Sequence, residues 1–126
     1  MTTQEKTMTT TEVASRLVSL CRKGDFETAQ KELFADDVIS IEPYATPEFA
    51  KETKGLDAVI EKGEKFQSMV EKMHNMEVGD PIIAHSSFAC TMRLDVTMKG
   101  KERMDMTELC VYQIKDGKIS KEEFVM

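Results

Sequence analysis

Residues 33–43 read LFADDVISIEP. The β-branched residues of VISI are typical of a strand, and the pair Asp36-Asp37 marks a turn before it. Pro43 ends the strand, because proline has no N–H group to donate to a sheet ladder. Glu42 is therefore a carboxylate at the end of a strand whose apolar residues are needed for a core. A charged residue at such a position needs an explanation.

Two helices are predicted before this strand. Thr9 and Glu12 have the spacing of a capping box, and apolar residues recur at three- and four-residue steps from there to Lys23-Gly24. Asp25 caps a second helix with apolar residues on one face, which runs to the turn at Asp36. Residues 1–8 are polar and rich in threonine, so we expect a loose N-terminal tail, followed by one domain over residues 9–126.

The chain after residue 43 predicts one further helix and then strands. An apolar stripe at helical spacing runs from Leu56 to Met73, which predicts a third helix with His74 at its end. Strand-like runs then cover residues 82–98, 103–114 and 119–126, separated by the turn signals KGK and KDGK. Helices first and a meander last predict an α+β domain, with three N-terminal helices packed on an antiparallel sheet.

Two-residue turns at Gly100-Lys101 and Asp116-Gly117 would fix the pairing of these strands. The pairing predicts an inner face with Cys90, Met92, Leu94, Thr107, Leu109, Val111, Glu122, Phe124 and Met126. It predicts an outer face with Ala89, Thr91, Arg93, Asp95, Met104, Met106, Glu108, Cys110 and Tyr112, including an ion pair between Arg93 and Glu108. The methionines and Tyr112 favour a homodimer contact through this outer face. Glu122 is a carboxylate on an apolar face, so it should have water, a partner or a ligand.

Composition excludes several classes of function. The chain has 126 residues and a net charge of -6 with no basic stripe, which argues against nucleic acid as a partner. No apolar run approaches the ~20 residues of a membrane span, so we expect no membrane partner and a cytoplasmic location. Three widely spaced cysteines and two histidines lack the spacing of metal ligands, so no metal site is predicted.

Three stretches together are similar to a known family: LFADDVISIEP at residues 33–43, KGLDAVIEKGEKF at 54–66 and VYQIKDGKISKEEF at 111–124. They resemble the SnoaL-like branch of the nuclear transport factor 2-like superfamily, over residues 10–126. The resemblance implies a cone-shaped α+β barrel, in which a curved sheet wraps a long helix and leaves a pocket, and frequent homodimers. Its members include ketosteroid isomerases, polyketide cyclases, dehydratases, epoxide hydrolases and binding modules without catalysis.

The resemblance carries over to single residues only in part. Glu42 stands directly before Pro43, where the isomerases have their general-base carboxylate. The tyrosine that stabilises the oxyanion in those enzymes falls on Leu17, however, and their protonated aspartate falls near Val111. The His-Trp-Asp element of the cyclases aligns with Glu122, Glu123 and Phe124, so a phenylalanine replaces the catalytic aspartate.

These observations predict a pocket protein that binds a small, largely apolar molecule. Glu42 is the candidate catalytic base, and the candidate ligand contacts are Tyr44, His74, Met92, Glu122 and Phe124. An enzyme of this kind would be an isomerase, dehydratase or hydrolase that works by acid/base catalysis without a cofactor. The alternative is a ligand-binding or dimerisation module without catalysis, in which Glu42 and Glu122 are structural.

Overall fold

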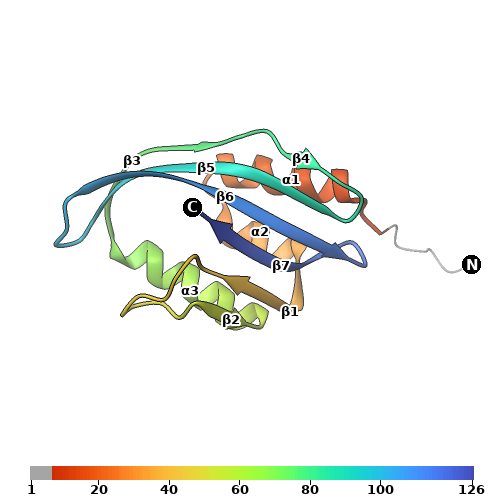
Figure 1. The fold of residues 1–126 in the computed structure, drawn as a ribbon, viewed down its shortest axis with the longest axis horizontal. Coiled ribbons are helices and arrows are strands. Elements are labelled where there is room, and N and C mark those ends of the chain that lie inside the picture. Colours follow the sequence, from red (N-terminus) through yellow and green to blue (C-terminus); the bar gives the residue numbers. More distant parts are fainter. Residues whose placement is uncertain (1–6) are drawn as a thin grey trace, which may run out of the picture.

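The computed structural model describes residues 7–126, and most of the predicted tail, residues 1–6, lies outside the described residues. In residues 7–126 the helices are α1 (Thr10–Arg22), α2 (Phe26–Leu33) and α3 (Leu56–Met69) (Figure 1). The strands are β1 (Phe34–Ile41), β2 (Glu52–Lys54), β3 (Val70–Val78), β4 (Ile82–Ile83), β5 (Ser87–Met98), β6 (Arg103–Lys115) and β7 (Lys118–Val125). The predicted α+β class is confirmed.

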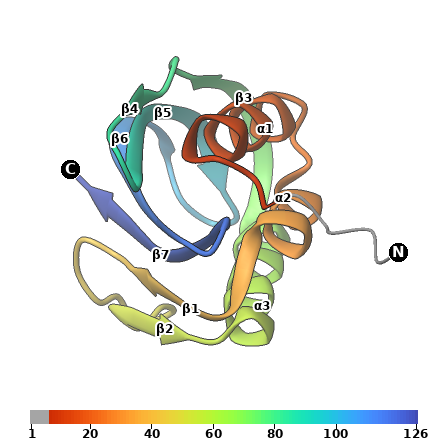
Figure 2. The same ribbon diagram turned by 90° about the vertical axis from the view of Figure 1, so that its right-hand side faces the viewer.

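The sheet is mixed and does not close into a barrel. Its strand order is β2-β1-β7-β6-β5-β3, and β4 pairs with β5 at one end. β1 runs parallel to β7, while the other pairs are antiparallel, so the expectation of a purely antiparallel sheet is wrong at this one pair. The sheet bends strongly, and its concave side faces the three helices (Figure 2).

Helix α1 forms as the sequence predicts. Thr9 accepts a hydrogen bond from the backbone N–H of Glu12, and the Glu12 side chain accepts one from the N–H of Thr9, which completes the capping box. Six side chains of α1 are buried, among them Val13 and Leu17, and they pack with Leu33 and Val38 into the core. Met8 also packs against this core.

The third helix is shorter than predicted. It ends at Met69, and the chain continues directly into β3, so His74 lies in a strand and not at a helix end. The residues from Val70 onward pair antiparallel with β5, beginning with Val70 opposite Met98. Pairing with the edge of β5 satisfies the backbone of this segment, and the helical spacing of its apolar residues is overridden by that tertiary contact.

The predicted register between β5 and β6 is wrong by one residue. Arg103 pairs with Thr97, whereas the predicted turn pairs Arg103 with Met98. The turn is closed by the N–H of Lys101, which donates to the carbonyl of Met98 at 3.0 Å, with Gly100 at a φ of 73°. Because one residue of slip turns every side chain to the other face, the inner face of β6 carries Met106, Glu108, Cys110 and Tyr112, and Leu109 and Val111 point outward.

A β-bulge changes the pairing of β6 with β7. Lys115 pairs with Lys118 across the predicted turn at Asp116-Gly117, where both central residues have positive φ. The register then shifts between Ile114 and Gln113, so Ser120 is an extra residue on β7. Glu122 consequently lies opposite Tyr112 and not opposite Val111, which was the prediction.

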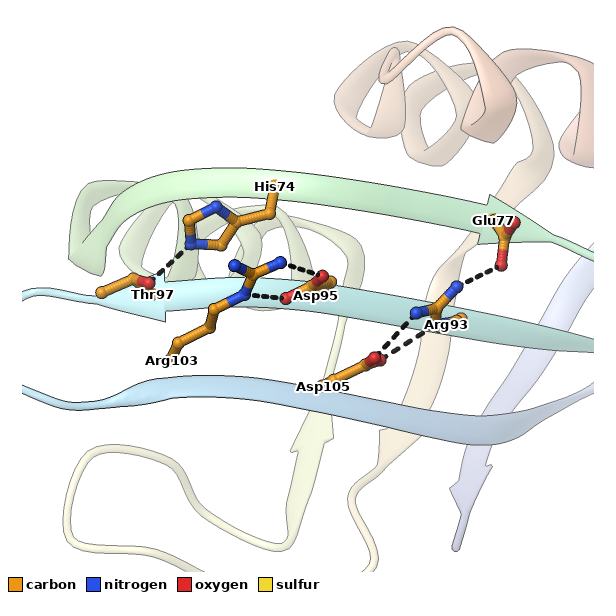
Figure 3. Close-up of polar contacts among 7 residues, drawn as sticks. All are labelled: His74, Glu77, Arg93, Asp95, Thr97, Arg103 and Asp105. Atoms are coloured by element: carbon orange, nitrogen blue, oxygen red, sulfur yellow. Dashed lines mark hydrogen bonds and ion pairs between the residues drawn. The ribbon is translucent and has the colours of Figure 1, made fainter.

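The outer face of the sheet carries ion pairs. Arg93 binds Asp105 through two hydrogen bonds of 3.0 and 2.7 Å and contacts Glu77 at 3.0 Å, so the predicted pair of Arg93 with Glu108 is wrong (Figure 3). Arg103 holds Asp95 through two hydrogen bonds in the same way. Met106 and Tyr112, expected on this face as part of a dimer contact, lie inside.

Candidate functional site

A cavity of about 750 Å³ lies between the helices and the concave side of the sheet. Most of its wall is apolar, with contributions from all three helices and from β5, β6 and β7. Representative lining residues are Leu17, Phe26, Ile60, Phe66, Met92 and Phe124. A cavity of this size and character matches the clefts in which proteins bind small molecules.

The apolar stripe of α3 faces this cavity. Val59 is the one residue of α3 that is fully buried, whereas Ile60 and Phe66 stay half-buried and line the cavity. Side chains of this type usually pack against other residues across a core. Here Ile60 and Phe66 line the cavity, so the apolar stripe of α3 contributes to the cavity wall as well as to the core.

A chain of hydrogen bonds joins four polar side chains in the cavity wall. Lys62 on α3 donates to Ser40 Oγ at 2.6 Å and to Glu42 Oε2 at 3.0 Å. Ser40 Oγ donates to Glu122 Oε1 at 2.7 Å. The side chains of Lys62 and Glu42 are 15% and 28% exposed, so this ion pair is shielded from water better than a surface pair.

The local sequence places these groups together. Along β1 the side chains of Val38, Ser40 and Glu42 alternate onto the inner side, so the two polar residues follow a buried valine into the cavity wall. Ser40 is directly paired with Glu122 in the parallel register of β1 and β7. That register depends on the bulge at Ser120, which sets the face of Glu122.

Two carboxyl groups in the wall have raised pKa values. Burial raises the pKa of Glu122 to about 6, although the hydrogen bond from Ser40 and the charge of Lys62 act in the opposite direction. Burial, together with the negative charges of Glu42 and Glu122, raises the pKa of Glu108 to about 7. In residues 7–126 Glu108 makes no hydrogen bond or ion pair. Glu108 and Glu122 can therefore gain or lose a proton close to neutral pH.

Four of the predicted site residues lie at the cavity. Glu42, Met92, Glu122 and Phe124 line it, and Nζ of Lys62 lies 5.6 Å from the centre of the Phe124 ring. Leu17 also lines the cavity.

The structure does not bring the other two predicted residues to the cavity. Tyr44 is 61% exposed in the loop after β1 and is not part of the lining. His74 contacts Thr97 Oγ1 at 2.7 Å through Nε2 and lies beside the Asp95 and Arg103 pair (Figure 3). It therefore belongs to a polar cluster away from the cavity.

Sequence reasoning missed Ser40, Lys62 and Glu108. The alternation of β1 contained the signal for Ser40, because it shares a face with Val38 and Glu42. Glu108 was assigned to the outer face through the register error. Lys62 stands among the polar residues that flank the stripe of α3, and nothing in the sequence marks it as the partner of Glu42.

Two further properties hold for residues 7–126. No group of three or more histidine, cysteine, aspartate or glutamate residues there is arranged to hold a metal ion. Within the same residues, no helix combines the length and the apolar character that a membrane crossing requires.

Comparisons with known proteins agree with the fold. Residues 8–126 match the model of the SnoaL-like domain. A Mesorhizobium loti structure, assigned to the SnoaL-like polyketide cyclases, is 32% identical, with a TM-score of 0.88 over 94% of this chain and 100% of that chain. No match was found among curated proteins.

Two more distant structures share the fold. An isomerase-assigned protein from Bacillus subtilis is 14% identical, with a TM-score of 0.70 over 91% of this chain and 84% of its own. A nuclear transport factor 2-like protein from Burkholderia pseudomallei is 13% identical, with a TM-score of 0.73 over 91% and 88%.

Proposed function

Because the chain belongs to the SnoaL-like domain family, we propose that its cavity binds a small, largely apolar molecule and that carboxyl groups in the wall move a proton on it. The observation that carries this proposal is the convergence of Glu42, Glu108 and Glu122 with Lys62 at one cavity whose wall is mostly apolar. The names of the structural neighbours, a polyketide cyclase and an isomerase, support chemistry of this kind without deciding the reaction.

The proposed roles follow from the surroundings of each group. Lys62 fixes the carboxylate of Glu42, which is the candidate base for a proton on a carbon beside a ligand carbonyl. Glu108 has its pKa near 7, so it can hold a proton at neutral pH and give it to the carbonyl oxygen. The two transfers together convert a ketone into its enol. An isomerase or a dehydratase that acts on carbons beside a carbonyl group can use this step, and the step requires no cofactor.

The alternative function is binding without catalysis. The ion pair of Glu42 with Lys62 favours it, because Oε2 of Glu42 is already engaged by the ammonium group of Lys62 and is not free to contact a ligand. In that case Glu42 and Glu122 fix the shape of the wall, and the cavity only holds its ligand.

Deuterium exchange separates the two functions. Compounds with a carbonyl group that raise the melting temperature would be incubated with the protein in D₂O, and the loss of the protons beside the carbonyl would be followed by NMR. Catalysis predicts exchange that is accelerated by the wild-type protein and reduced at least about tenfold by Glu42→Gln or Glu108→Gln. Binding with no acceleration would leave the non-catalytic function.

A homodimer through the outer face of the sheet remains part of the proposal. The register removes Met106 and Tyr112 from this face and places Ala89, Val111, Leu109 and Val125 there in adjacent cross-strand pairs. Ile82 pairs with Ala89 and extends the row, and it is one of the most exposed large apolar residues. An apolar patch of this kind favours contact with a second copy.

The proposed location is the cytoplasm. Cys21, Cys90 and Cys110 are free thiols in the core, and Cys90 lies opposite Cys110 on neighbouring strands. Unpaired cysteines at such close positions agree with a reducing compartment.

A further inference from the structure

The charged side chains that line the cavity are unbalanced. Among the described residues, the acidic ones are Glu27, Glu42, Glu64, Glu108 and Glu122, and Lys62 is the basic one. Lys62 already contacts Glu42, and Glu27 contacts Lys31 on the helix surface. Among the described residues Glu64, Glu108 and Glu122 make no ion pair; Glu64 is exposed and Glu122 accepts a hydrogen bond from Ser40, so Glu108 is the half-buried one that faces the cavity with neither kind of contact.

The wall is also rich in aromatic rings. Of the six phenylalanines in the chain, Phe26, Phe34, Phe49, Phe66 and Phe124 line the cavity, and Tyr112 joins them. The face of an aromatic ring attracts a positive charge, and rings together with carboxylates are the groups by which proteins hold organic ammonium ions. Neither the rings nor the carboxylates would favour an anionic ligand.

In the same wall, Lys62 already has its ammonium group held by an aromatic ring and by oxygen acceptors. The ammonium group of Lys62 lies near the ring of Phe124 and donates to Ser40 and Glu42. An ammonium group at this depth is therefore accommodated by a ring on one side and oxygen acceptors on the other. Glu108, the partnerless carboxyl group, offers a second place of the same kind.

We infer that the ligand is an apolar organic cation, an amine or ammonium compound whose charged nitrogen lies beside Glu108 while its hydrocarbon part fills the aromatic wall. This inference rests on the binding part of the proposed function and adds the class of ligand to it. Beside an ammonium group Glu108 is the charged carboxylate, so with such a ligand it anchors the nitrogen and does not donate a proton to a carbonyl oxygen. The charges of Glu42 and Glu122 act on Glu108, and the charge of Lys62 acts on it in the opposite direction, so that end of the cavity holds three carboxyl groups against one ammonium group. Binding of a cation offsets this excess, which a neutral ligand of the same shape cannot do.

Three compounds of matched shape test the inference: 4-phenylbutylamine, 4-phenylbutanol and 4-phenylbutyrate. Their dissociation constants would be measured at pH 7 by calorimetry with the wild type, with Glu108→Gln, and with Glu102→Gln as the control. Glu102 is exposed and lies outside the cavity lining. Circular dichroism would show that each variant is folded.

We expect the wild type to bind the amine about tenfold more tightly than the alcohol, and the carboxylate most weakly, because a charged contact out of water is stronger than a neutral one. Glu108→Gln should remove the preference for the amine and keep the affinity for the alcohol, while Glu102→Gln should behave as the wild type. Equal binding of amine and alcohol by the wild type, or a preference that survives Glu108→Gln, would overturn the inference about the ligand class and leave the proposed binding function intact. If none of the three compounds binds, the proposed function fails with it.

Discussion

Glu108 is the residue whose charge depends most clearly on its neighbours. It lies opposite Met92 on the adjacent strand, faces the cavity and has the charges of Glu42 and Glu122 nearby. A carboxyl group in this position is poorly hydrated and makes no ion pair among residues 7–126, and the positive charge of Lys62 offsets the burial and the two negative charges only in part. The neutral form is therefore favoured in the folded protein relative to the unfolded chain.

The first prediction concerns the pH dependence of stability. The pKa of Glu108 is about 7 in the fold against 4.5 ordinarily, so the folded state holds the proton more tightly. The free energy of unfolding should therefore fall as the pH rises from about 4.5 to about 7, with a loss of up to about 3 kcal/mol from this residue. Glu108→Gln should match the wild type near pH 4.5 and exceed its stability by about 1–3 kcal/mol at pH 8.

Urea unfolding at several pH values measures this difference. Glu71→Gln, an exposed substitution on β3, serves as the control and should leave the pH profile of the wild type intact. A Glu108→Gln profile parallel to that of the wild type would show that Glu108 does not bind its proton more tightly in the folded state.

The second prediction concerns Lys62. Lys62→Met removes the donor to Glu42 and Ser40, so the side chain of Glu42 loses its ion-pair partner in a shielded place. We expect a loss of about 1–3 kcal/mol in the free energy of unfolding at pH 7, and we expect Glu42→Gln in the same chain to recover most of it. Lys72→Met, at an exposed position, is the matched control. Additive effects of the two substitutions in a double-mutant cycle would show that the pair does not interact.

For the helices and strands, features that depend on neighbouring residues are predictable from the sequence, whereas the pairing register of the strands is not. The capping box at Thr9 and the turn at Asp116-Gly117 depend on neighbouring residues, and both formed as predicted. The faces of β6 depend on the length of one turn, and β6 has apolar residues on both faces, such as Met106 inside and Leu109 outside. The hydrophobic pattern therefore could not correct a register error of one residue.

The candidate site was predicted only in part for the same reason. Glu42 and Glu122 were found because Pro43 marks the end of β1 and because Glu122 stands out on an apolar face. The bulge at Ser120 and the turn at Gly100 each shift the register by one residue, so Glu122 kept its inner face and Glu108 changed sides. Lys62 depends on how α3 lies against β1, which only the assembled fold determines.

The third prediction compares two glycines in different elements. Gly117 has a φ of 74°, and a Cβ there would lie 2.4 Å from Thr7 Cγ2. Gly63 lies in α3, where a Cβ would approach Gln30 at an ordinary 3.6 Å. Gly117→Ala should lower the free energy of unfolding by about 1–2 kcal/mol, whereas Gly63→Ala should raise it by about 0.5–1 kcal/mol. Guanidinium unfolding of both variants checks the opposite signs; equal effects would contradict the turn geometry.

At the scale of the whole molecule, the bent sheet has two different faces. The helices lie on the concave side of the sheet (Figure 2), and the cavity lies between them and the sheet. The other face carries the ion pairs around Arg93 and an apolar row that includes Leu109 and Val125. The proposed contact with a second copy and the proposed ligand site therefore lie on opposite faces of the sheet.

The fourth prediction tests the outer face. Leu109→Asp places a charge in the middle of the apolar row, where Leu109 is paired with Val125. Light scattering with size-exclusion chromatography should give a dimer for the wild type and a monomer for this variant. Glu71→Gln, outside the apolar row, should stay dimeric. A wild type that is monomeric at high micromolar concentration would exclude the proposed dimer.

The most direct test of the account is to ask whether a small molecule enters the cavity. Four of the ten methionines, Met73, Met76, Met92 and Met106, line it, and Met98, Met104 and Met126 do not. In protein labelled with ¹³C at the methionine methyl groups, titration with 4-phenylbutanol or 4-phenylbutylamine should shift the four cavity signals saturably and leave the other three in place. Shifts confined to Met104 and Met126, or no saturable shift with either compound, would contradict the claim that this cavity is a binding site.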